Sequence, residues 1–267
     1  MTNQEQINSR IIALVQEIRL SSIDRDIVKS LLESIRDDVT LQLKKLTVST
    51  GALHHIDPTL VSAAVLKIPE CIIPSSHPGQ LEAIITGVSN STSASLRHLH
   101  HLDLRHSQVA PDILAGAALK LETFNVTLSR LQVETVLTRL AATEDSRLRQ
   151  LEVSNYIDLS SLDPEVVTGA LTKLETVGSQ LSVGLSPGQV SALLSRIHES
   201  PDLRLLQLHL CDQNICHVPL EVVVGAIQKL EKVVCRRVRM TDNQATAIFN
   251  FVKRVNIKSI KIIGVIG

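Results

Sequence analysis

A short phrase recurs along this chain at a nearly constant interval. The tetrad Lys-Leu-Glu-Thr occupies residues 120–123 and 173–176, and the related tetrads Lys-Ile-Pro-Glu and Lys-Leu-Glu-Lys occupy residues 67–70 and 229–232. The lysines of successive copies are 53, 53 and 56 residues apart. Self-similarity at a fixed period of this size is typical of repeat proteins, in which each supersecondary unit stacks on the next. The sequence therefore predicts a stacked array of one copied unit.

A second phrase, Leu-x-x-Leu-x-Val/Leu, occupies the intervals. Its copies are Leu43, Leu46 and Val48; Leu99, Leu102 and Leu104; Leu148, Leu151 and Val153; Leu203, Leu206 and Leu208; and, with isoleucine, Ile257, Ile260 and Ile262. The middle residues advance by 56, 49, 55 and 54 positions. Two kinds of half-repeat therefore alternate, and each has the length of one short strand plus one helix or turn.

Helix signals lie between the expected strands. Segments 58–68, 111–121 and 164–174 carry proline in the first turn, where its missing N–H group is not needed. Asp57 and Asp163 precede two of these prolines as expected N-caps. A fourth copy, at 218–230, has one additional residue, so the start of its helix should differ. The other half-repeat has helical segments that begin at Gln80, Gln132, Gln189 and Gln244.

The N-terminal region continues the pattern. Residues 27–35 have the same apolar stripe as these helices, and residues 3–18 form a further amphipathic segment. We therefore expect an N-terminal capping helix within residues 1–20 and a repeat array over residues 21–267. A cap of this kind would cover the open face of the first repeat.

Composition excludes several classes of protein. Hydrophobic residues make up 44% of the chain but aromatic residues only 1%, so the core must be aliphatic. Lys and Arg total 27 and so do Asp and Glu, which implies no bulk attraction to nucleic acid or to a membrane. The sequence shows no secretory signal and no apolar run long enough to cross a bilayer. With only four irregularly spaced cysteines, a reduced, cytoplasmic setting is expected.

Residues able to do chemistry are scarce. The phosphate-binding loop Gly-x-x-x-x-Gly-Lys-Ser/Thr and the zinc motif His-Glu-x-x-His are both missing from the sequence, so we expect neither a cofactor nor an enzyme. His209, Cys211, Cys216 and His217 offer four potential zinc ligands within nine residues. The alternative, which we favour, is that the cysteines are small buried apolar residues. The histidines His98, His100, His101 and His106 are expected to be ordinary surface residues rather than a pH-sensitive patch.

This combination of phrases resembles the leucine-rich repeat family, and within it the ribonuclease-inhibitor-like subclass, which also alternates two repeat types. Residues 162–177 and 185–194 look most like repeats of NOD-like receptor proteins. The resemblance implies an α/β solenoid, a horseshoe with parallel strands on its concave face and helices on its convex face. The family's asparagine or cysteine after the strand is mostly replaced, for example by Ser107 and Ser129.

The resemblance also implies a non-catalytic protein–protein interaction module that binds a partner protein on the concave face, in innate immune recognition or signalling. The alternative is a regulator of an enzyme, such as a GTPase activator or a ribonuclease-inhibitor-like protein. Because side chains alternate across a strand, the contact surface consists of the outward positions between the inward leucines. They are Lys45, Thr47, His101, Asp103, Arg105, Thr123, Asn125, Gln150, Glu152, Thr176, Gln207, His209, Lys232 and Lys261.

Two features near the end of the sequence suggest further contacts. A basic cluster comprises Arg236, Arg237, Arg239, Lys253, Arg254, Lys258 and Lys261. It has no interleaved aromatic residues on which bases could stack, so an acidic protein partner is favoured over single-stranded nucleic acid. The strand expected at 260–267 would expose an edge, and we expect either that the chain is a shortened version of a longer array or that this edge pairs with a second copy.

Overall fold

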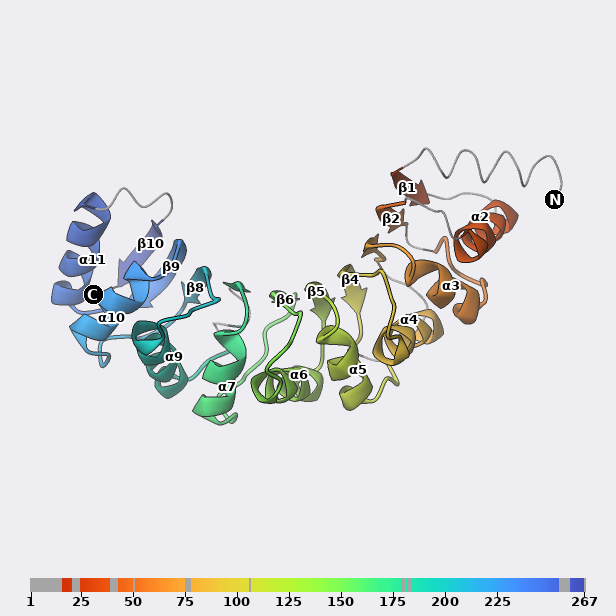
Figure 1. Ribbon diagram of the computed structural model, residues 1–267. Helices are drawn as coiled ribbons and strands as arrows, with labels where there is room; N and C mark the ends of the chain where they lie inside the picture. Colours follow the sequence, from red (N-terminus) through yellow and green to blue (C-terminus); the bar gives the residue numbers. More distant parts are fainter. Residues whose placement is uncertain are drawn as a thin grey trace. The chain divides into compact units, whose positions relative to one another are not determined.

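The computed structural model describes residues 16–20, 25–38, 43–49, 51–74, 78–105, 107–178, 181, 184–254 and 260–266. The chain forms two compact units, unit 1 at Met1–Gln132 and unit 2 at Val133–Gly267. Each unit alternates short strands with helices (Figure 1). Each is thus an α/β solenoid of the leucine-rich repeat kind, which confirms the predicted fold class.

The elements of unit 1 are β1 (Glu17–Leu20), α2 (Arg25–Asp37), β2 (Lys45–Val48), α3 (Pro58–Val65), β3 (Glu70–Ile72), α4 (Pro78–Asn90), β4 (His98–Asp103), α5 (Pro111–Ala118) and β5 (Thr123–Thr127). The chain passes into unit 2 within α6 (Arg130–Ala142). The remaining elements are β6 (Gln150–Val153), α7 (Pro164–Leu171), β7 (Thr176–Val177), α9 (Pro187–Glu199), β8 (Gln207–Cys211), α10 (Leu220–Gln228), β9 (Lys232–Arg239), α11 (Asp242–Arg254) and β10 (Ile260–Ile266).

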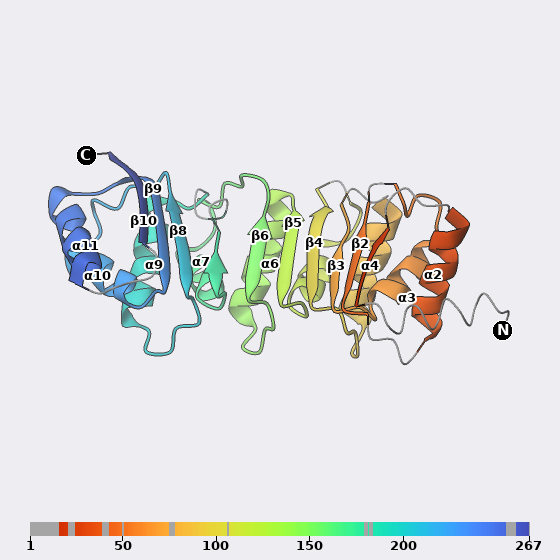
Figure 2. The ribbon, with the colours of Figure 1, turned by 90° about the horizontal axis from the view of Figure 1, so that it is seen from above.

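The strands of each unit are parallel and pair in sequence order. In unit 1 each strand from β1 to β5 pairs with the next, and in unit 2 the same holds from β6 to β10. The helices lie on one side of each sheet (Figure 2). Parallel strands need a crossover between them, and here a helix supplies each crossover.

The register corrects the phase of the second phrase. Leu46, Cys71, Leu99 and Phe124 lie opposite one another in unit 1, whereas the sequence analysis placed Leu102 at the middle position. In β4 a register shift between His100 and Leu102 lets both Leu99 and Leu102 be buried.

The same correction applies in unit 2. Leu151, Val177, Leu208 and Val233 are aligned, so Leu208 rather than Leu206 is the middle residue. Leu206 is only half-buried. The phrase Leu-x-x-Leu-x-Leu fits residues 205–210 as well as 203–208, and only strand pairing distinguishes the two.

Two helix lengths alternate, as the two half-repeats predict. The helices α2, α4, α6, α9 and α11 have 13 residues each, and α3, α5 and α7 have eight. Asp57 and Asp163 accept hydrogen bonds from the backbone N–H groups of Thr59 and Glu165, which confirms both predicted N-caps. In α10 the proline is itself the N-cap rather than the first helical residue, so this helix does begin differently.

The third residue of α4, α6, α9 and α11 is a buried glutamine that joins adjacent coils. The Gln189 amide nitrogen donates to the carbonyl oxygens of Leu159 and Leu162 at 2.8 and 2.7 Å, and its oxygen accepts from the Ser186 N–H at 2.8 Å. Gln244 repeats this arrangement one repeat later. Because every buried backbone group needs a partner, these glutamines satisfy backbone groups between coils.

The lysine of the recurring tetrad has a matching role at the other end of the long helices. Lys173 Nζ donates to carbonyl oxygens of Leu140, Ala141 and Thr143 at the C-terminus of α6. Lys120 and Lys229 do the same for α4 and α9. A cation there satisfies free carbonyls and interacts favourably with the helix dipole.

The core is aliphatic, as composition predicted. Leucine, isoleucine, valine and alanine fill it, and Phe124 is the largest fully buried side chain. None of the helices in the described ranges has the length and apolar composition that a membrane crossing requires.

The N-terminal prediction needs a correction. Glu17–Leu20 form strand β1, which pairs with β2 in parallel, so residues 17–20 belong to the sheet rather than to a capping helix. Most of the expected capping helix, residues 1–15, lies outside the described residues. At the other end β10 pairs with β9, and pairing of a second copy with β10 stays a prediction.

Candidate interaction surface

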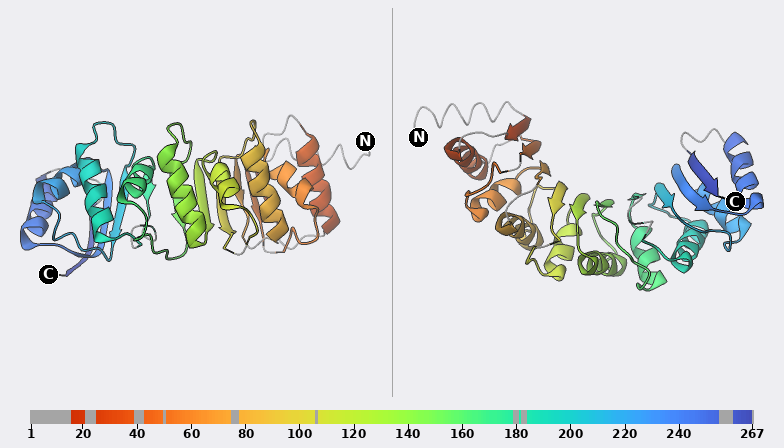
Figure 3. Two further views of the ribbon diagram at one scale, coloured as in Figure 1. Left: turned by 90° about the horizontal axis from the view of Figure 1, so that it is seen from below. Right: turned by 180° about the vertical axis from the view of Figure 1, so that it is seen from behind.

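Each sheet has a side opposite its helices, which we call the helix-free face. Alternate strand residues point to this side, while their neighbours point toward the helices and are buried. The views from above and from behind show the helices of each unit gathered on one side of its strands (Figures 2 and 3). The polar strand residues are thus fixed on a scaffold that is hydrogen-bonded on both flanks.

In unit 2 the predicted residues form a row. Gln150, Thr176, Gln207 and Lys232 are direct register partners across β6, β7, β8 and β9. All four side chains are half-buried. The structure therefore brings these four predicted residues together.

His209 forms part of a second row on the same face. It lies opposite Val234 and is half-buried. Burial lowers the pKa of its imidazole, and the charge of Lys232 lowers it further, whereas Glu152 on β6 acts in the opposite direction. The lowered pKa favours the neutral imidazole, which has one donor and one acceptor.

In unit 1 the equivalent row consists of Lys45, Glu70, His98 and Thr123. Lys45 Nζ forms an ion pair with Glu70 at 2.8 Å, and the Glu70 carboxylate raises the pKa of the lysine. Thr123 was predicted to be exposed, but it is only 7% accessible, and its hydroxyl lies 3.0 Å from His98 Nδ1. The predicted contact surface did not include Glu70 and His98, because the sequence does not show which residues of each strand lie opposite one another.

The other predicted residues of unit 1 surround this row. Thr47 and Asn125 are half-buried strand residues that pair with Ile72 and His100. His101 lies in the irregular part of β4 with a φ of 65°, exposed to solvent.

Asp103 ends β4, and both of its carboxylate oxygens accept from Arg105, at 3.1 and 2.7 Å. The predicted residues of unit 1 thus include both partners of the Asp103–Arg105 ion pair. They include only Lys45 of the Lys45–Glu70 ion pair.

Several predicted groups lie outside the described part of the structure. The backbone of Lys261 belongs to β10, but its side chain is outside the described part. His106 and Lys258 are outside it entirely.

Strand β9 carries a basic segment that the list of predicted contact residues omitted. Arg236, Arg237 and Arg239 are exposed, whereas Val238 between them is buried. Arg237 donates to the Asp212 carboxylate at 2.6 Å. The basic cluster in the sequence already contains these arginines. Which of them are exposed follows only when the alternation of buried and exposed residues along β9 is known.

The four potential zinc ligands, against which the sequence analysis decided, do not converge. His209 points to the helix-free face, Cys211 is buried, and Cys216 and His217 are exposed in the loop after β8. His217 Nε2 lies 3.2 Å from the carbonyl oxygen of Pro187. Over the residues that the structure describes, no three His, Cys, Asp or Glu side chains are grouped to hold a metal ion.

The buried cysteines behave as apolar residues. Burial raises the pKa of the Cys71 thiol strongly and that of Cys235 to about 12. A thiol with a raised pKa is a poor nucleophile and a poor metal ligand, because both roles need the thiolate.

No protein-family model matches the chain, and no curated protein matches it. Among solved structures, the chain is similar to the crystal structure of the leucine-rich repeat-containing protein LegL7 from Legionella pneumophila. The two share 13% sequence identity with a TM-score of 0.49, over 99% of this chain and 86% of LegL7. The assignment of this chain to the leucine-rich repeat architecture rests on its own strand pairing and alternating half-repeats.

Proposed function

We propose that this protein is a non-catalytic protein-binding module and that the helix-free faces are its contact surfaces. The observation that carries the proposal is the row of polar side chains in direct register across four strands in each unit. Side chains on paired strands are already ordered, so binding costs less conformational entropy than it would on a loop.

The proposal leaves the partner open. The likeness of residues 162–177 and 185–194 to NOD-like receptor repeats supports a setting in innate immune recognition. A regulator of an enzyme would use the same faces, and a panel of small GTPases tests this alternative directly. A hydrolysis rate that rises on addition of the protein would favour the GTPase-activating alternative.

The decisive experiment is affinity capture of a binding partner with variants of the contact surface. In unit 1, exchanging the two charges in the variant Lys45→Glu/Glu70→Lys keeps the ion pair but reverses the polarity presented to a partner. In unit 2, Gln207→Arg places a new charge in the middle of the row. We expect at least one of the two to reduce capture about tenfold or more, since a like-charge contact in an interface costs several kcal/mol.

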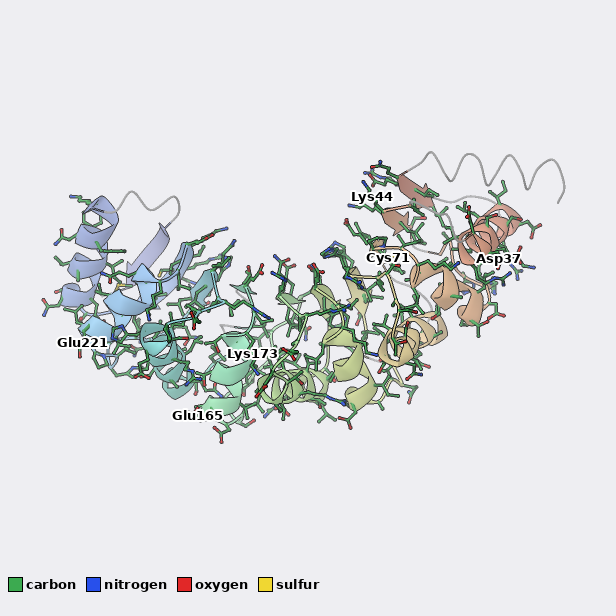
Figure 4. The ribbon with its side chains drawn as sticks, in the orientation of Figure 1. Asp37, Lys44, Cys71, Glu165, Lys173 and Glu221 are labelled. Atoms are coloured by element: carbon green, nitrogen blue, oxygen red, sulfur yellow. The ribbon has the colours of Figure 1, made fainter. Side chains whose placement is uncertain are left out.

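Matched controls lie on the helices. Glu165 on α7 and Glu221 on α10 are exposed and stand on the helix side of unit 2 (Figure 4). Glu165→Lys and Glu221→Lys change the charge by as much as the test variants do or more, but should leave capture unchanged. If capture survives every change on the helix-free faces and is lost with a helix variant, the proposed surface is wrong.

A further inference from the structure

The helix-free faces of the two units differ in how their charges are satisfied. In unit 1, Lys45 pairs with Glu70, Arg19 with Glu17, and Arg105 with Asp103. Most of the charged side chains on the helix-free face of unit 1 are thus neutralised by ion pairs with other residues of the same unit.

In unit 2 the cations of β9 are not neutralised in this way. Across the described residues, Lys232, Arg236 and Arg239 take part in no ion pair of 4.0 Å or less. One carboxylate beside this strand, Asp212, is already bound to Arg237, and Glu231 directly precedes the strand. Four cations and one bound carboxylate therefore leave an excess of positive charge along β9. The cations are Lys232, Arg236, Arg237 and Arg239, and the carboxylate is Asp212.

The geometry of β9 places these cations on one side. Val233, Cys235 and Val238 are buried, so Lys232, Val234, Arg236 and Arg239 point to the helix-free face. The interval from Cys235 to Val238 contains one additional residue, Arg237, which has a φ of 53°. The register of β9 with the chain on either side does not shift at this residue, so β9 continues past it and Arg239 lies on the same side as Arg236.

The backbone around these cations is strained and tightly held. Asp212 and Arg237 both have a positive φ, 56° and 53°, which costs a residue other than glycine about 1 kcal/mol or more. Hydrogen bonds from Asp212 N to Arg236 O at 2.9 Å and from Arg239 N to Gln213 O at 2.8 Å fix this arrangement. Backbone strain of this kind clusters at ligand-binding and switch positions, which makes this part of β9 a candidate contact site.

We propose that strand β9 of unit 2 binds an acidic segment of a partner protein, whose carboxylates pair with Lys232, Arg236 and Arg239. Val234, half-buried between Lys232 and Arg236, receives an apolar side chain of the same segment. The three cations span roughly 20 Å of strand, enough for about six residues of an extended chain. This inference rests on the proposed function and adds the chemistry of the partner to it.

The chemistry of the face favours a peptide over nucleic acid. The sequences of β6, β7, β8 and β9 contain no Phe, Tyr or Trp on which a base could stack, and His209 is the one ring among them. The formal charge of the whole chain is zero, so no long-range attraction to a polyanion adds to the local one. Guanidinium groups match carboxylates, like phosphates, with two parallel hydrogen bonds, so the scarcity of stacking surface and the neutral chain are what favour a peptide.

The test uses the full chain and three labelled probes of similar length, an alternating Glu-Leu peptide, its Lys-Leu counterpart and an oligothymidylate. Binding is followed by fluorescence anisotropy at low and at high salt. We expect the acidic peptide to bind, the basic peptide not to bind, and the affinity to fall as salt rises, because exposed ion pairs are screened. Tighter binding of the oligothymidylate than of the acidic peptide would overturn the inference in favour of nucleic acid.

Variants assign the binding to β9. Arg236→Glu/Arg239→Glu should weaken the acidic peptide about tenfold or more, which corresponds to two lost exposed ion pairs. Arg196→Glu changes an exposed cation on α9 and should leave the affinity unchanged. Equal weakening by both variants would show unspecific attraction and overturn the inference. Circular dichroism of each variant checks that it is folded.

The outcomes separate this inference from the proposed function. If Gln207→Arg abolishes capture of the natural partner while Arg236→Glu/Arg239→Glu has no effect on it, the helix-free face is a contact surface but the partner segment is not acidic. If neither variant affects capture and the acidic peptide does not bind, both proposals fail for unit 2.

Discussion

Lys173 donates a hydrogen bond from Nζ to the carbonyl oxygen of Ala141 at 2.7 Å, across two consecutive coils. The same ammonium reaches Thr143 at 2.8 Å, so one side chain closes the C-terminus of α6. This contact is the physical reason for the lysine in the recurring tetrad, since it ties each short-helix coil to the long helix before it.

Removing this ammonium should destabilise unit 2. Lys173→Met keeps the length of the side chain but leaves three carbonyl groups without their donor, and we expect the free energy of unfolding to fall by about 1.5–3 kcal/mol. Urea titration followed by circular dichroism measures the change. Lys44→Met is the matched control, because Lys44 is exposed and should cost less than about 0.5 kcal/mol (Figure 4). Equal losses for the two variants would contradict the capping role.

The buried glutamine ladder should be more sensitive still. Gln189 is 0% exposed and makes three hydrogen bonds to the backbone, so Gln189→Met should lower the free energy of unfolding by about 2–4 kcal/mol. Gln189→Glu should cost more, because a carboxylate would face two carbonyl oxygens. Gln207→Met, on the helix-free face, is the control and should change stability by less than about 0.5 kcal/mol. A tolerated Gln189→Met would show that the ladder is dispensable.

Two glycines four residues apart should respond in opposite ways to alanine. A β-carbon on Gly184 would overlap the carbonyl oxygen of Ile157, and the Gly184 carbonyl accepts from the Leu159 N–H at 2.8 Å. Two backbone segments therefore meet here, and Gly184→Ala should cost about 1–3 kcal/mol. Gly188 lies in open space in the first turn of α9, so Gly188→Ala should be neutral or stabilise by up to about 1 kcal/mol. Thermal unfolding of the two variants gives the comparison.

The four thiols should differ in reactivity. Cys71, Cys211 and Cys235 are buried and Cys216 is exposed, so a disulfide reagent should modify one thiol quickly in the native protein and all four in denaturant. Fast reaction of two or more native thiols would mean that the strands carrying the buried cysteines open readily.

Alkaline pH should weaken the fold through Cys235. Its pKa rises from 9.0 to about 12 on folding, so the folded state holds the proton more tightly than the unfolded state. The stabilising contribution is complete below pH 9 and is lost as pH rises from about 9 towards 12. Cys235→Ala should lower stability at neutral pH because it leaves a cavity, but should reduce the decline above pH 9. Unfolding midpoints measured across this range test the sign.

The sequence alone determined the class of fold. The period of the lysines, the prolines before short helices and the aspartate caps are local signals, and each corresponds to an element of the structure. An aliphatic composition with almost no aromatic residues also predicted the core correctly. These features depend on residues near in sequence, which is why a pattern in the sequence reveals them.

Only the tertiary structure decided the phase of the strands and the roles of the recurring polar residues. Leu206 and Leu208 both fit the phrase, and pairing with Val177 selects Leu208 because that side chain can be buried. Gln189 and Lys173 recur visibly in the sequence, but their acceptors lie about 30 residues away along the chain. Which cations on the helix-free faces are already paired was likewise decided by neighbouring strands, since an ion pair depends on distances between coils that no local pattern contains.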